Sequence, residues 1–84
     1  MEKPYKPISC SFYDYLEAYI IKGKPVDLKF YEDNGALTDI NVKLKNLKTV
    51  SGEEFLIFEG GKEIRLDQLI SIENIQLDQF GRTC

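Results

Sequence analysis

One helix-forming segment near the N-terminus, followed only by strand-like sequence, constrains the fold of this chain most. Ser11 is the expected N-cap, since its hydroxyl can accept a hydrogen bond from a free backbone N–H of the first turn. Asp14 then falls at the third helical position, where a carboxylate suits the positive end of the helix dipole. Gly23 and Pro25 end the segment. The sequence therefore predicts a helix over about residues 11–22.

This predicted helix has one apolar face and one polar face. At about 100° per residue, a single stripe faces the core, made of Phe12, Leu16, Tyr19 and Ile20. Asp14 and Glu17 point the opposite way, with Ile21 on the same outer line. We expect the stripe to be buried and the two carboxylates to be exposed.

After Gly23 the apolar residues alternate, as in strands with one buried face. The pattern predicts five strands, over about residues 25–32, 37–50, 55–58, 64–66 and 70–73. Turn signals separate them at Asn34-Gly35, Ser51-Gly52 and Gly60-Gly61. The continuous apolar run from Phe55 to Phe58 is typical of a central strand covered on both faces.

Two irregularities shape the expected sheet. Leu47 lies an odd number of residues from Leu44, so a bulge or a sharp bend near Lys45-Asn46 is needed for both to face inward. The segment from Asp67 to Leu69 looks like a single turn before the last strand. A long bent second strand and a one-turn break favour a strongly bent barrel.

The expected fold is mainly β with one N-terminal helix: a small five-stranded Sm-like or SH3-like barrel capped by the helix. An OB-fold is the main alternative, but its helix usually lies between strands three and four. We expect a single domain over residues 1–84, with the barrel at about 25–73. The segment 74–84 alternates only weakly and is predicted to be a loose tail.

Composition and charge limit the possible functions. The formal net charge is −3, and residues 51–84 carry seven acidic against three basic side chains. This balance argues against a general polyanion binder and favours a positively charged protein partner. The chain has no histidine, which removes the commonest general base and the usual nucleophile arrangements. We expect no enzyme activity, no metal and no cofactor.

The two cysteines do not suggest a disulfide framework. Cys10 is predicted to be a small buried residue beside the helix start, and Cys84 an exposed thiol. No apolar run approaches the roughly 20 residues that cross a membrane, and the first residues do not resemble a signal peptide. A cytoplasmic location is expected.

The chain also resembles a known family. The motif Tyr5-x-Pro7-Ile8-x-Cys10-x-x-Tyr13-Asp14-x-Leu16-Glu17, with the later segment Ile64-Arg65-Leu66-Asp67-Gln68-Leu69, is similar to the Rof family of Rho-binding antiterminators. The similarity covers roughly residues 5–73. It implies an Sm-like barrel with an N-terminal helix, in a bacterial protein that binds the transcription terminator Rho at its RNA-binding domain and keeps RNA from loading.

The resemblance also implies a site and a partner. By matched position, Tyr13, Asp14 and Glu17 would contact Rho, with no direct nucleic-acid binding, and the free protein would be a monomer. Two alternatives remain open at this stage. One is an Sm-like RNA-binding module, of which several copies could assemble into a ring, and which would use Lys43, Lys45 and Lys48. The other is a small structural or interaction domain with a different partner.

Overall fold

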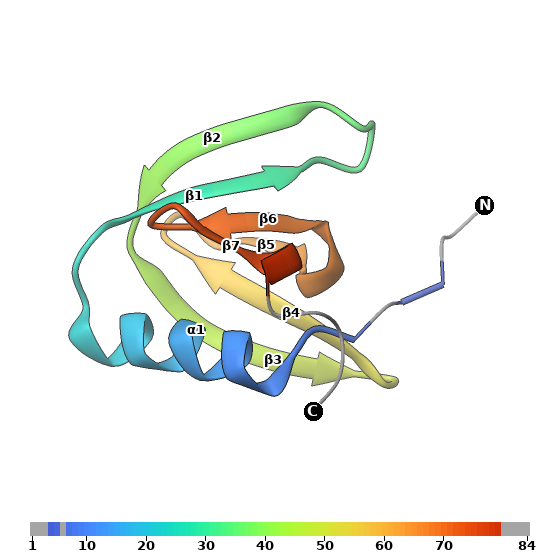
Figure 1. The fold of residues 1–84 in the computed structure, drawn as a ribbon, viewed down its shortest axis with the longest axis horizontal. Helices are drawn as coiled ribbons and strands as arrows, with labels where there is room; N and C mark the ends of the chain where they lie inside the picture. Colours follow the sequence, from blue (N-terminus) through green and yellow to red (C-terminus); the bar gives the residue numbers. More distant parts are fainter. Residues whose placement is uncertain (1–3, 6, 80–84) are drawn as a thin grey trace.

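The computed structural model describes residues 4–5 and 7–79, and these form a mainly β structure with one helix (Figure 1). The four-stranded antiparallel sheet has the order β2-β1-β6-β7, and the three-stranded antiparallel sheet has the order β3-β4-β5. The elements are α1 (Cys10–Lys22), β1 (Val26–Tyr31), β2 (Leu37–Val42), β3 (Leu44–Val50), β4 (Glu53–Phe58), β5 (Lys62–Arg65), the 3-10 turn η1 (Leu66–Gln68), β6 (Leu69–Ile72), β7 (Ile75–Gln76) and the 3-10 turn η2 (Leu77–Gln79).

The helix begins earlier than the sequence predicts, because Ser9 and not Ser11 is the N-cap. Ser9 has extended backbone, and its hydroxyl accepts a hydrogen bond of 3.1 Å from the Ser11 backbone N–H. Ile8, just before the cap, is buried in the core, and this anchor fixes where the chain turns into the helix. Asp14 therefore lies beyond the first turn, so its predicted place at the third helical position is wrong.

The end and the buried face of α1 match the prediction. Gly23 takes a left-handed φ of 67° and donates its N–H to the Tyr19 carbonyl at 3.2 Å, as a glycine terminator does. Phe12 and Leu16 are fully buried, and the half-buried Tyr19 and Ile20 pack against the same core. The helix lies alongside β3 (Figure 1) and closes one side of the core.

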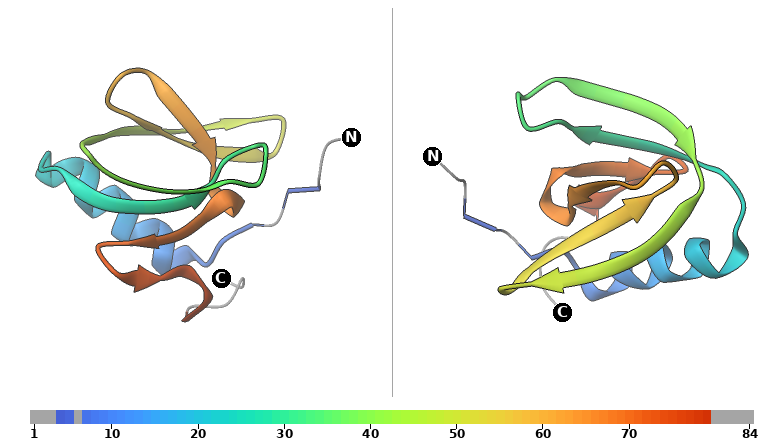
Figure 2. Two further views of the ribbon diagram at one scale, coloured as in Figure 1. Left: turned by 90° about the horizontal axis from the view of Figure 1, so that it is seen from above. Right: turned by 180° about the vertical axis from the view of Figure 1, so that it is seen from behind.

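The predicted second strand is two strands joined at Lys43. β2 pairs with β1 in the four-stranded sheet, and β3 pairs with β4 in the three-stranded sheet. Figure 2 shows β2 continuing into β3 as one bent ribbon. The register of β3 shifts between Leu44 and Asn46, which confirms the bulge or bend expected there. This bend carries the chain from one sheet to the other.

The two sheets do not close into a barrel, so the predicted five-stranded closed barrel is wrong. The chain passes from β5 to β6 through η1, and β5 pairs only with β4 among the described strands. A 3-10 turn therefore replaces the ladder that closure would need at this side. β4 is central in its sheet, as expected. However, only Leu56 and Phe58 are buried, and the predicted cover on its other face is partial.

The segment that follows β6 is ordered as far as it is described. Glu73 and Asn74 both have positive φ and form a two-residue turn into β7, which pairs with β6. Leu77 in η2 is only 3% exposed and belongs to the core. The prediction of a loose tail is therefore wrong for residues 74–79, because Leu77 has a buried site to fill. Residues 80–84 lie outside the described residues.

Cys10 also differs from its prediction. It is exposed and disulfide-bonded, and the described residues include no free cysteine. Cys10 precedes the buried Phe12 by two residues, which places it about 200° away around the helix and hence towards solvent. Cys84, the other cysteine of the sequence, lies outside the described residues. None of the helices in the described part of the chain is long and apolar enough to span a membrane.

Candidate partner-binding surface

The three predicted site residues lie on the N-terminal half of α1, and they divide into two kinds. Asp14 and Glu17 are exposed and lie three residues apart, so they are neighbours on the helix surface. Ile21, one turn further on the same line, is 85% exposed. Tyr13 is half-buried and packs against the core. The outer face of α1 thus offers two carboxylates and one uncovered aliphatic side chain.

Tyr13 connects this helix face to the start of β4. The pKa of its phenol is raised, first by burial and then by the negative charges of Glu54 and Glu17. Glu54 is the second residue of β4, 41 positions after Tyr13 in the chain. The Tyr13 ring therefore lies within electrostatic reach of carboxylates from two different elements. This arrangement extends the predicted site beyond the helix.

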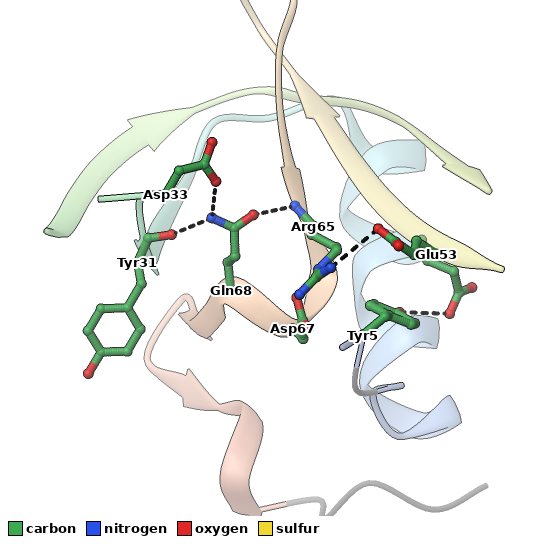
Figure 3. A network of polar contacts seen from close by, with 8 residues as sticks. Tyr5, Tyr31, Asp33, Glu53, Arg65, Asp67 and Gln68 are labelled. Atoms are coloured by element: carbon green, nitrogen blue, oxygen red, sulfur yellow. Dashed lines mark hydrogen bonds and ion pairs between the residues drawn. The ribbon is translucent and has the colours of Figure 1, made fainter. Parts of the chain in front are cut away.

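Tyr5 also contacts Glu54. Its hydroxyl donates a hydrogen bond of 3.1 Å to the Glu54 Oε1 atom, and the Arg65 guanidinium carbon is 5.6 Å from its ring centre (Figure 3). Burial and the charge of Glu54 raise the pKa of Tyr5 well above its ordinary value. The segment before α1 is therefore tied to β4 and β5, and it brings a second tyrosine to the same surface.

Arg65 is the cation of this region, and its charge is already balanced. Its Nε atom donates to Asp67 Oδ1 at 2.7 Å, and its Nη1 atom lies 3.3 Å from Glu53 Oε1. The bond to Asp67 is the main reason that the pKa of Arg65 is raised. A guanidinium held between two carboxylates is a poor anion-binding group, because its positive charge is already balanced.

Gln68 fixes the turn that presents this arginine. Its side-chain carbonyl accepts the Arg65 backbone N–H at 2.8 Å, and its amide nitrogen donates to the Tyr31 carbonyl at 2.8 Å and to Asp33 Oδ1 at 3.2 Å (Figure 3). One side chain thus joins η1 to the end of β1. This cross-link holds the β5–η1 corner, and with it Arg65 and Asp67, in a fixed place.

We define the acidic surface by the residues that these contacts and the helix face bring together. Five of its members are carboxylates and one is a guanidinium, so the surface is strongly negative. It contains no group of three or more potential metal ligands, and neither does the rest of the described chain. Its chemistry suits a cationic partner with exposed N–H donors or aromatic groups. The members are Tyr5, Tyr13, Asp14, Glu17, Glu53, Glu54, Arg65 and Asp67.

Sequence reasoning missed five members of this surface: Tyr5, Glu53, Glu54, Arg65 and Asp67. The acidic excess of residues 51–84 was the available signal, but it does not say where each carboxylate lies. The turn at Ser51-Gly52, with φ values of 52° and 81°, starts β4 at Glu53. Only the folded structure brings Glu54 into hydrogen-bond contact with Tyr5 and lets its charge raise the pKa of Tyr13.

Of the three lysines of the RNA-binding alternative, Lys48 is already paired with a carboxylate. Lys48 makes an ion pair of 2.7 Å with Glu63, and its ammonium lies 5.6 Å from the Phe55 ring centre. Lys43 is half-buried at the junction of β2 and β3, whereas Lys45 is exposed. One of the three predicted RNA contacts is therefore already paired with a carboxylate.

Comparison with protein-family models, with curated proteins and with solved structures gives no match for this chain. The geometry of the acidic surface is therefore the main guide to function.

Proposed function

We propose that this chain is a Rof-like protein that binds the transcription terminator Rho at its RNA-binding domain, blocks RNA loading and so causes antitermination. The observation that supports the proposal is the grouping of carboxylates from α1 and β4 with two tyrosines: Tyr5 donates a hydrogen bond of 3.1 Å to Glu54, and burial together with the charges of Glu54 and Glu17 raises the pKa of Tyr13. These residues make the predicted contact set part of a larger negative surface. The sequence resemblance supplies the identity of the partner.

The mechanism follows from what an RNA-binding site must offer. Such a site is cationic and carries aromatic or apolar platforms on which bases stack. Asp14, Glu17 and Glu54 would occupy the positions of phosphates, and Tyr13 would lie where a base stacks. Binding of this protein and binding of RNA then exclude each other. The protein inhibits by occupying the site, and no catalytic step is needed.

The fold is consistent with this reading. A strand that bends from one sheet into the other, together with an N-terminal helix on the core, supports an Sm-like relationship even though the sheets stay open. A monomeric, cytoplasmic, bacterial protein would meet Rho directly.

The test is a competition experiment with Rho and a fluorescent single-stranded RNA. Increasing amounts of the wild-type protein should displace the RNA, with a matching loss of termination in a transcription assay. The Asp14→Lys/Glu17→Lys variant should displace it far less well, since two attractive contacts become repulsive ones. Circular dichroism checks that the variant is folded.

A matched control separates the position of the charges from their number. Glu59→Lys/Asp78→Lys makes the same change in net charge at two exposed residues outside the acidic surface. This control should displace RNA as well as the wild type does. If both double variants lose activity equally, the effect is one of overall charge and the acidic surface is not the interface.

The same materials test the RNA-binding alternative. In a gel-shift experiment the isolated protein should leave generic single-stranded RNA unshifted at physiological salt. A shift at sub-micromolar protein, together with a ring-sized mass in solution, would overturn the proposal in favour of an Sm-like RNA-binding assembly.

A further inference from the structure

A polar pocket opens on the outer face of the four-stranded sheet, away from the acidic surface. It has a volume of about 260 Å³ and is lined by Asp27, Lys29, Asp39, Ser71 and Asn74. Along β1 the inward side chains Val26, Leu28 and Phe30 are buried in the core, and the residues between them face the other way. The pocket therefore lies across the sheet from the core that α1 covers.

Three strands and one turn build this pocket. Lys29 in β1 is the central residue, because it lies opposite Asp39 of β2 on one side and Ser71 of β6 on the other. Asn74 comes from the β6–β7 turn. The pocket is thus part of the sheet itself, and its members are fixed by strand register rather than by a free loop.

Asp27 is held in place by hydrogen bonds with Asn41 and Glu73. Its Oδ1 atom accepts a hydrogen bond of 2.9 Å from the Asn41 side-chain amide. Its backbone N–H donates to Glu73 Oε2 at 2.8 Å, and its carbonyl accepts the Glu73 N–H at 2.8 Å. These bonds leave the other carboxylate oxygen of Asp27 to face a ligand.

Two donors in the pocket have no partner within the described part of the chain. Ser71 is only 4% exposed as a residue, and its hydroxyl forms no hydrogen bond with a described residue. No fully buried side-chain oxygen or nitrogen of the described residues lacks a partner, so the Ser71 hydroxyl oxygen itself is open to solvent in the pocket. Lys29 forms no ion pair among residues 4–5 and 7–79, although Asp39 lies directly across the ladder. A hydroxyl and an ammonium are therefore available for an anionic group.

An apolar patch lies on the same face of the sheet, further along β1 and β2. Tyr31 and Leu37 are cross-strand partners two residues beyond Lys29 and Asp39, and they are 51% and 59% exposed. Two residues along a strand correspond to roughly 7 Å. An apolar group of a ligand bound at Lys29 could reach this pair.

We propose that this pocket binds a free α-amino acid with an apolar side chain. The ligand carboxylate would accept from the Lys29 ammonium and the Ser71 hydroxyl. Its ammonium would donate to the carboxylates of Asp27 and Asp39, and its side chain would cover Tyr31 and Leu37. The volume is slightly below the roughly 300–1,000 Å³ of pockets for drug-sized ligands, which suits so small a molecule. This site is independent of the proposed binding of Rho.

The test is a titration of the full chain with L-phenylalanine, followed by calorimetry and by NMR shifts of the sheet amides. A shallow site for so small a ligand should give a Kd on the order of 1 mM. The amine phenethylamine and the acid 3-phenylpropanoate each lack one charged group, and each should bind at least about tenfold more weakly. Rho is absent, so the result does not depend on the proposed function.

Variants locate the site. Lys29→Met should weaken L-phenylalanine binding at least about tenfold, because it removes the charged donor for the carboxylate. Lys45→Met removes a lysine that is exposed in the other sheet, and it should bind like the wild type. The proposal is overturned if the wild type shows no saturable binding, if phenethylamine alone binds as tightly, or if the two folded variants behave alike.

Discussion

The hydroxyl of Tyr5 donates a 3.1 Å hydrogen bond to the carboxylate of Glu54, 49 positions further along the chain. This bond joins the segment before the helix to the start of β4 in the three-stranded sheet. It also explains why a negative surface with two tyrosines forms here, although its members are scattered through the sequence.

The pH dependence of stability should report on Tyr5. Its pKa is held above the ordinary value of 10.0, so the tyrosine ionises less readily in the folded than in the unfolded chain. The free energy of unfolding should therefore be undiminished below that pH and should fall as pH rises above it. Tyr5→Phe should reduce this alkaline loss, with the remainder due partly to Tyr13, whose pKa is also raised. Urea unfolding of both proteins across alkaline pH measures the effect, and an unchanged slope would contradict it.

The true N-cap can be identified by a pair of alanine substitutions. Ser9→Ala should cost about 1 kcal/mol in the free energy of unfolding, because it removes the acceptor for a first-turn N–H. Ser11→Ala, at an exposed position inside the helix, should be nearly neutral. Chemical denaturation of the two variants gives the comparison. Equal costs would mean that Ser9 does not act as the cap.

Leu16 should be among the positions of the helix that tolerate truncation least. It is fully buried between α1 and the sheets, so Leu16→Ala should cost roughly 2–4 kcal/mol through lost burial and the cavity left behind. Ile21→Ala is the matched control, since the Ile21 side chain is 85% exposed and little packing is lost. Thermal or urea unfolding should separate the two variants clearly, and similar midpoints would argue against the observed packing of α1.

Salt should weaken the proposed complex with Rho. The acidic surface acts through exposed carboxylates, whose attraction to a cationic site is screened as ionic strength rises. The association rate should fall more than the dissociation rate changes, which stopped-flow mixing at several salt concentrations can resolve. A complex that forms equally fast at low and high salt would speak for an apolar interface instead.

The sequence predicted local features of the helix and strands better than it predicted which parts of the chain pack together. The glycine end of α1 and the register irregularity after Leu44 depend on local chemistry, and the structure confirms both of them. The N-cap was misplaced by two residues because Ser9 and Ser11 are chemically equivalent as caps. Only the burial of Ile8 distinguishes them, and that is a tertiary effect.

The members of the acidic surface were harder to predict from the sequence than the helix and strands. Tyr13, Asp14 and Glu17 were grouped correctly as residues of one helical segment, and their role as a contact site remains a prediction. Glu54 could not be added, since no local pattern shows which strand end packs beside the helix. Leu77 was missed for a related reason. The weak alternation of apolar residues in segment 74–84 did not reveal that the core had a place for the Leu77 side chain.

The burial of Leu77 has a consequence for synthesis on the ribosome. Ile8, Phe12 and Leu16 enter the same apolar cluster as Leu77, so the earliest and latest described parts of the chain complete one core. The helix can form as soon as it emerges, but its apolar face stays open to solvent until the last strands arrive. The nascent chain should therefore become protease-resistant only after residue 77 has left the exit tunnel, in a single late step rather than gradually.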